Sequence, residues 1–177
     1  DFRQAIASFK QDLPTILDTL RELIDNMLSQ KPGFFEKPGF LSQFNAFLKL
    51  CQESINPELN SDDIREMIIQ HILTEDIFIN IFQEGEFHRE NNIAKSLHKV
   101  IETFFTGTLK KNTFKTIENY YSVIIRTAAN LTDHHEKQQF LKKVYEEFYK
   151  GYNPLAADRL GIVYTPNEIV NFMVEST

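Results

Sequence analysis

The chain has 177 residues, of which 42% are hydrophobic and 25% are charged. These proportions fit one or two globular domains, and the 16 Phe and six Tyr side chains supply ample core material. No segment approaches the roughly 20 consecutive apolar residues that span a bilayer, and the first residues do not resemble a signal peptide. The single cysteine, Cys51, excludes an internal disulfide and favours a cytoplasmic location.

The net charge of −6 argues against a simple nucleic-acid-binding domain, because such domains are usually basic. The charge is uneven, however. Residues 1–94 hold 8 basic and 16 acidic side chains, whereas residues 95–177 hold 11 and 9. The first part should repel DNA, and the second part could lie near phosphates. Ordinary variation between surface helices is the alternative explanation.

Apolar residues recur every three or four positions along most of the chain, which predicts helices. The first such stripe covers residues 6–27, with a break or kink expected near Asp12 because Pro14 follows. Residues 31–39 contain two Pro-Gly pairs and predict a loop. A second helix then runs from Leu41 to Ile55, and Asn56-Pro57 ends it.

Ser61, followed by two aspartates, predicts the start of a third helix. Thr74 is expected to cap a short fourth helix that Gly85 closes. A fifth helix begins at Asn91 or Asn92 and continues to Phe105. A turn is predicted over residues 107–112, and a sixth helix over residues 114–128.

Asp133 and Glu136 form a capping box that opens a last long helix, which reaches Tyr149. No segment alternates with period two over a convincing length. The sequence therefore predicts an all-α, multi-helix orthogonal or bundle-like domain over residues 1–150. Residues 151–177 are interpreted as a linker and the truncated start of a following domain.

A second capping box lies near the end of the chain. Thr165 is a good N-cap, Pro166 suits the first helical position, and Glu168 stands three residues after the cap. The chain stops at Thr177, two or three turns into this helix. We therefore expect the chain to be a fragment of a larger protein.

The residues around this cap resemble a known family. Residues 161–173 read GIVYTPNEIVNFM, which is similar to motif X at the start of many N6-adenine DNA methyltransferase domains. Residues 73–78 read LTEDIF and, with the Asn153-Pro154 spacing, resemble the helical region before the methylase in single-chain Type ISP restriction-modification enzymes. The specific match covers roughly the last 30 residues.

This resemblance implies a helical coupler inside a larger enzyme, which is often described as a type I restriction enzyme R protein. Tyr164, Thr165 and Pro166 would border the pocket for S-adenosylmethionine. ATP and Mg²⁺ would bind in other domains, and DNA would be reached through the parent enzyme. A plain capped helix start is the alternative for the three residues. A stand-alone helical protein-interaction module without a nucleic-acid role is the alternative for the whole chain.

The search for chemistry within the chain predicts no catalytic residue and no metal site. A Gly-rich phosphate loop and the Asn/Asp-Pro-Pro-Tyr/Phe box of the methylases are absent, so the chain alone should neither hydrolyse ATP nor methylate DNA. His134 and His135 are adjacent and would point to different sides of a helix, which disfavours zinc. The carboxylates of residues 84–90 fit a solvated loop.

The many aromatic residues have helical spacing, which favours a core over a base-stacking platform. The apolar residues of the tail need a place to be buried once the following domain is missing. We expect them to fold back on the helices, to pair with a second copy of the chain, or to stay mobile.

Overall fold

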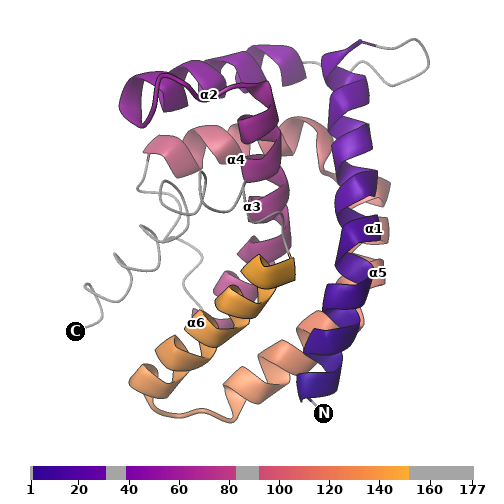
Figure 1. Cartoon of the computed structure of the whole chain (residues 1–177), viewed down its shortest axis with the longest axis vertical. Helices are drawn as coiled ribbons and strands as arrows, with labels where there is room; N and C mark the ends of the chain where they lie inside the picture. Colours follow the sequence, from indigo (N-terminus) through magenta and orange to yellow (C-terminus); the bar gives the residue numbers. More distant parts are fainter. Residues whose placement is uncertain (1, 31–38, 83–91, 152–177) are drawn as a thin grey trace. The chain divides into compact units, whose positions relative to one another are not determined.

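The computed structural model describes residues 2–30, 39–82 and 92–151, and these residues form six α-helices and no strand (Figure 1). The predicted all-α class is therefore confirmed. In chain order the helices are α1 (Phe2–Leu28), α2 (Phe40–Ser54), α3 (Ser61–Phe82), α4 (Asn92–Phe104), α5 (Gly107–Ala129) and α6 (His134–Gly151).

The chain divides into two compact units. One unit comprises residues 1–15 and 119–177, and the other comprises residues 16–118. The division falls inside α1 directly after Thr15 and inside α5 directly after Glu118. The predicted boundary between residues 150 and 151 stays a prediction, because residues 152–177 lie outside the described part of the chain.

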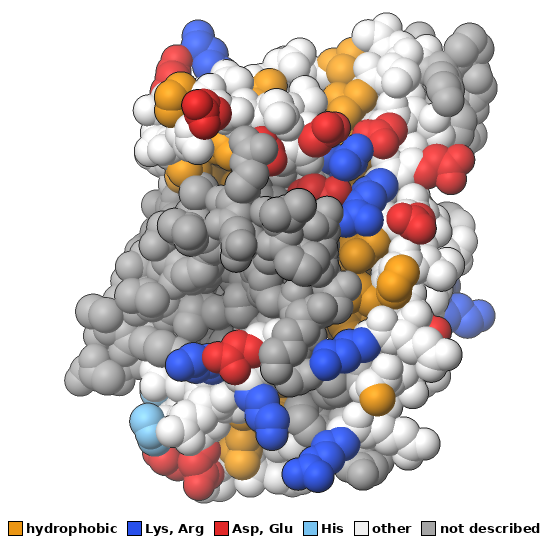
Figure 2. Space-filling model, in the orientation of Figure 1, with side chains coloured by type: hydrophobic (Ala, Val, Ile, Leu, Met, Phe, Trp, Pro, Cys, Tyr) orange, Lys and Arg blue, Asp and Glu red, His pale blue; other side chains and the backbone are white. Residues whose placement is uncertain are grey.

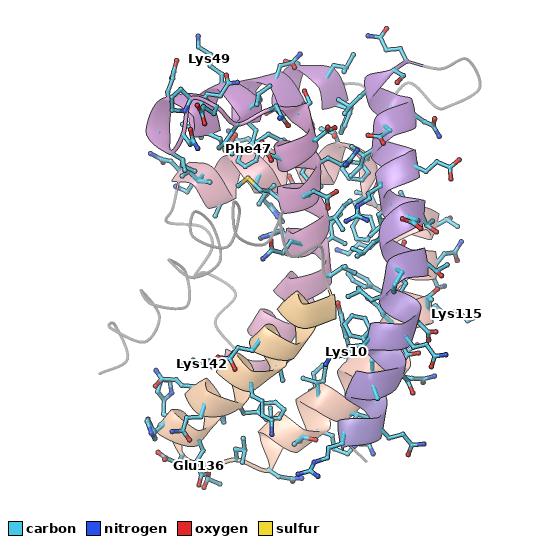
Figure 3. The ribbon with its side chains drawn as sticks, viewed as in Figure 1. Lys10, Phe47, Lys49, Lys115, Glu136 and Lys142 are labelled. Carbon is cyan, nitrogen blue, oxygen red and sulfur yellow. The ribbon has the colours of Figure 1, made fainter. Side chains whose placement is uncertain are left out.

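Phenylalanine packing between α2 and α4 forms much of the core of the unit 16–118, where these helices lie side by side (Figure 1). The Phe40 ring lies 5.5 Å from the Phe104 ring in an edge-to-face arrangement and 5.7 Å from the Phe44 ring. Figure 3 shows Phe47 on the side of α2 that faces α4. Edge-to-face pairs add attraction beyond the burial of their area.

A second run of rings connects α4 to α5 within the same unit. Phe105 contacts Phe104 at 6.2 Å and Phe114 at 5.5 Å between ring centroids. Phe104 and Phe105 are buried, and so is Tyr121 of the other unit. The interpretation as core residues is therefore confirmed for Phe104, Phe105 and Tyr121, whereas Tyr120 is half-buried. Phe34 and Phe35, to which it also applied, lie outside the described residues.

In the unit made of residues 1–15 and 119–177, Phe9 of α1 packs against two tyrosines of α5. Its ring lies 5.3 Å from Tyr120 and 6.3 Å from Tyr121. The Tyr120 hydroxyl donates a hydrogen bond to the Asp12 carboxylate. This hydrogen bond, together with some burial and the negative charge of Asp12, raises the pKa of Tyr120 above its ordinary value.

The break predicted in the first helix is wrong, because α1 continues through Pro14. The alternative of a kink there stays a prediction. A proline inside a helix removes one backbone hydrogen bond and costs about 3 kcal/mol. Leu13, Ile16 and Leu17 are buried around it, and each such side chain stabilises the fold by about 1.5–3 kcal/mol. Burial along one helix face therefore outweighs the local cost of the proline.

The separate short helix predicted from Thr74 is also wrong, because α3 continues from Ser61 to Phe82. A threonine costs less than about 0.7 kcal/mol in a helix interior, and Ile72 and Leu73 directly before it are buried. The start of α3 differs by one residue from the expected cap. The Asn60 N–H donates to Asp63 Oδ2 (2.9 Å) and the Asp63 N–H donates to Asn60 Oδ1 (3.1 Å), a reciprocal capping box.

The turn predicted over residues 107–112 is the third error, because α5 begins at Gly107. Gly107 has a positive φ of 56°, a left-handed conformation that glycine adopts without strain. Lys110 and Lys111, which follow, are strong helix formers. Two lysines expected in a turn therefore lie on the first turns of a long helix.

The other predicted boundaries agree with the structure. Helix α2 ends before Asn56-Pro57, α4 begins at Asn92, and α6 begins directly after Asp133. The His135 N–H points to Asp133 Oδ1 at 3.4 Å, so Asp133 acts as a weak cap. Cys51 is fully buried, as its apolar stripe predicts, and burial raises the pKa of its thiol to about 12.

The buried face of α2 gives a direct test of the core. Replacing Phe44, which is 0% exposed, by Ala should lower the free energy of unfolding by about 3–5 kcal/mol, because the substitution removes buried area and leaves a cavity. Its exposed neighbour Asn45 offers a matched control, and Asn45→Ala should change stability by less than about 0.5 kcal/mol. Urea denaturation followed by circular dichroism measures both. Equal effects would mean that the core face of α2 is assigned wrongly.

Candidate functional site

The residues predicted to border a methyl-donor pocket, Tyr164, Thr165 and Pro166, lie outside the described residues, and so do the carboxylates of residues 84–90. The role assigned to Tyr164, Thr165 and Pro166 therefore stays a prediction. Within the unit 16–118, the structure shows two polar features that sequence reasoning did not find. The first is a network of charges between α1 and α3, and the second is a lysine-bearing face on α5.

The charge network is centred on Glu66 of α3. Arg21 of α1 donates to both of its carboxylate oxygens, through Nε at 2.7 Å and through Nη2 at 3.1 Å. Arg65 donates to Glu66 Oε1 at 3.1 Å and, through Nη1, to both oxygens of Asp25 of α1 at 2.9 and 3.0 Å. Two arginines and two carboxylates therefore connect α1 to α3 in both directions.

Burial makes this network stronger than an ordinary surface ion pair. The Glu66 side chain is 8% exposed, whereas those of Arg65 and Arg21 are 18% and 24% exposed. Burial alone would lower the pKa of Arg65, but the hydrogen bonds to Asp25 and Glu66 and their negative charges outweigh it and raise this pKa. Bidentate arginine–carboxylate pairs also fix orientation. The network therefore sets the position of α1 residues 21–25 on α3.

Two more exposed carboxylates border the network at longer range. Asp18 lies 3.7 Å from Arg21, and Asp62 lies 3.5 Å from Arg65. Figure 2 shows acidic and basic side chains interspersed where α1 and α3 meet the surface. Exposed pairs of this kind contribute about 0–1 kcal/mol. The energy of the network therefore resides in the inner four groups.

The sequence carries only a weak signal for this network. Arg21 and Asp25 stand one helical turn apart, and Arg65 and Glu66 are adjacent on another helix. These spacings indicate polar positions, but they do not show that residues 45 positions apart form a pair.

The second feature is the exposed face at the start of α5. Lys110, Lys111 and Lys115 are exposed, and no carboxylate of the described residues lies within ion-pair distance of them. Lys110 Nζ lies 5.9 Å from the centre of the Phe114 ring, a weak cation–π contact. Figure 3 shows Lys115 projecting away from the helices. Within the described part of the chain, these exposed lysines therefore form a basic face without a carboxylate partner.

Charge is unevenly distributed within the unit 16–118. Its described residues up to Leu73 carry 3 basic and 8 acidic side chains, whereas residues 92–118 carry 5 lysines and 2 glutamates. The uneven distribution of charge along the whole sequence is therefore also present within one compact unit. The basic residues belong to α4 and the start of α5.

The structure places four of the five histidines, and His88 lies outside the described residues. His71 is buried on α3, and His134 and His135 are exposed at the start of α6. His98 is half exposed and lies 3.1 Å from Glu102. Among the described residues, no group of three or more His, Cys, Asp or Glu side chains could hold a metal ion. No helix in that part of the chain is long and apolar enough to cross a membrane.

The fold and these contacts define the class of the domain: an all-α domain, in which the described polar groups hold helices together or form a charged surface. Comparison with known proteins gives its family. Residues 6–137 match the family model for the coupler domain of Type ISP restriction-modification enzymes. The chain therefore belongs to the Type ISP coupler family, and the resemblance noted in the sequence is confirmed.

A solved structure supports this assignment over nearly the whole chain. The structure described as "cryoEM structure DrdV-DNA complex" contains a chain that is 43% identical to this one, with a TM-score of 0.71. The match covers 99% of this chain but 17% of that chain. No curated protein matches the chain. The family assignment favours the coupler over the alternative of a stand-alone interaction module.

The charge network predicts a specific loss of stability. Glu66→Gln keeps the shape of the side chain but removes the negative charge shared by Arg21 and Arg65. We expect the free energy of unfolding to fall by about 2–3 kcal/mol, somewhat less than for a fully buried pair because both arginines are partly exposed. Urea denaturation measures this loss.

The control is Asp62→Asn, which removes an outer carboxylate with a 79% exposed side chain. This change should cost less than about 0.5 kcal/mol. If Glu66→Gln were as mild as the control, the network would not hold α1 on α3.

Proposed function

We propose that this coupler links an ATP-driven DNA motor to an N6-adenine DNA methylase within one restriction-modification enzyme and transmits movement between them. The observation that carries the proposal is the match of 99% of the chain to 17% of a much longer chain solved with DNA. A segment that fills a small part of a large enzyme, and belongs to a coupler family, fits a mechanical link between domains.

The charge network supports this role. A domain that transmits movement must keep its helices in fixed positions under load, because packed elements transfer displacement only as far as they stay rigid. Arg21 and Arg65 connect α1 and α3 through geometrically specific hydrogen bonds. A force applied along α1 would therefore reach α3 through these bonds and through the apolar core.

The methylase would begin at the capped helix near the end of the chain, with Tyr164, Thr165 and Pro166 at the edge of the S-adenosylmethionine pocket. Free N–H groups at a helix start suit a polar ligand edge. ATP and Mg²⁺ would bind in the motor, and DNA would be held mainly by other domains of the same enzyme.

A cytoplasmic location belongs to the same proposal. The chain has a single cysteine, which is free and buried, so no internal disulfide stabilises the fold. This fits an enzyme that acts on DNA in a reducing compartment.

Loosening the connection between α1 and α3 in the intact enzyme tests the coupling role. Arg21→Gln removes the bidentate contact with Glu66. We expect ATP hydrolysis and methylation to stay within about twofold, while DNA cleavage per ATP hydrolysed falls by roughly 2- to 30-fold, the range that coupling energies of about 0.5–2 kcal/mol produce. Parallel assays of phosphate release, methyl transfer and cleavage measure the three activities.

Arg126→Gln is the matched control, because Arg126 is an exposed arginine on α5 and its loss changes the net charge equally. It should leave all three activities unchanged. Cleavage per ATP that is the same in Arg21→Gln as in the unmodified enzyme would contradict the coupling role, provided that both proteins are folded by circular dichroism.

A second experiment tests the methyl-donor assignment. Tyr164→Ala in the intact enzyme should weaken S-adenosylmethionine binding by about tenfold, as expected for loss of one well-packed aromatic contact. Tyr152→Ala, upstream of the cap, serves as the control and should bind normally. Calorimetry measures both affinities. Unchanged donor affinity and methylation in Tyr164→Ala would reduce the motif to a plain helix start.

A further inference from the structure

We propose that the exposed lysine face at the start of α5 contacts the sugar–phosphate backbone of duplex DNA. This α5 lysine face consists of Thr108, Lys111, Asn112 and Lys115. The inference rests on the proposed function, which brings the domain next to DNA, and it assigns the contact to particular residues.

Helix geometry brings these four residues onto one face. Lys111 and Lys115 are four residues apart, as are Thr108 and Asn112, and such pairs are neighbours on a helix surface. All four residues are exposed. The two lysines are separated by about 6 Å along the helix axis, so their flexible side chains can reach neighbouring phosphates of one strand. The Thr108 hydroxyl and the Asn112 amide on the same face can donate further hydrogen bonds to phosphate oxygens.

The electrostatics of α5 favour an anionic partner. The first turn of α5 contains no acidic residue, although acidic groups are the ones that stabilise a helix start. Lys110 and Lys111 lie close to this positive end instead, and like charges there cost about 0.3–1 kcal/mol each. An external anion would remove this repulsion.

The distribution of charge in the unit favours DNA that approaches α5. The described residues up to Leu73 are strongly acidic and would repel DNA, whereas residues 92–118 are basic. A duplex would therefore be attracted to the α4–α5 part of this unit. Lysine is a compact charge without the planar fork that reads guanine edges, so the contact should be independent of base sequence.

The test compares two double variants of the 177-residue chain. Lys111→Gln with Lys115→Gln removes two charges from the α5 lysine face. Lys142→Gln with Lys143→Gln removes two charges from exposed positions on α6. Both doubles change the net charge equally, so a general charge effect would weaken both alike. Fluorescence anisotropy with a labelled duplex of about 30 base pairs, between about 50 and 200 mM KCl, gives the affinity and its salt dependence.

We expect the α5 double variant to bind at least about tenfold more weakly at 0.1 M salt, with a salt slope smaller by about 2, because each lost phosphate contact removes about 0.9 from the slope. The α6 double variant should stay within about twofold of the unmodified chain. Duplexes of different sequence should give the same values.

Three results would overturn the inference: no binding by the unmodified chain at about 50 mM KCl, an unchanged affinity in the α5 double variant, or equal losses in both variants. The first two would be expected if the lysines met an acidic surface of a neighbouring domain. The outcome is independent of the coupling experiment, because Arg21→Gln leaves the α5 lysine face intact. Failure of one proposal can therefore be distinguished from failure of the other.

Discussion

The sharing of the Glu66 carboxylate between two arginines is the constraint on which the arrangement of the unit 16–118 depends. Glu66 is nearly buried, and an isolated buried carboxylate would be strongly disfavoured. Its charge is tolerable only when Arg21 from α1 and Arg65 from α3 are both in place. Because Arg65 also holds Asp25, the two helices must meet at one register. Directional hydrogen bonds of this kind favour a particular register more strongly than hydrophobic packing does.

The aromatic core adds buried apolar surface to the specific contacts of the charge network. Phe40, Phe44 and Phe104 join α2 to α4, and Phe105 with Phe114 continues the contact to α5. Large rings bury much surface for little loss of side-chain freedom. The charged connection and the ring cluster involve different helices of one unit. In the proposed coupling role, a displacement of α1 would reach α3 through directional bonds, while α2, α4 and the start of α5 would move with the apolar core.

Periodicity of apolar residues was enough to predict an all-α domain and most helix boundaries. Its three errors, at Pro14, Thr74 and Gly107, have one physical origin. Each is a local signal for a break or turn, and in each case the helix follows the burial or the helix propensity of neighbouring residues instead. The charge network could not be predicted, since Arg21 and Glu66 are brought together only by the packing of α1 on α3. The role predicted for Tyr164 rests on family resemblance alone, because Tyr164 lies outside the residues that the structure describes.

The correction at Gly107 changes the functional interpretation of the domain. In a turn, Lys110 and Lys111 would point in unrelated directions and would not indicate a binding surface. On α5, Lys111 and Lys115 share a face with two small polar residues, close to the positive end of a helix. A net acidic domain can then touch DNA over this limited face while its other surfaces repel it. The proposed contact would be weak and sequence-independent, which fits the proposed place of the domain beside a DNA motor. Tight or base-specific binding at this point would hold the duplex in place and oppose translocation.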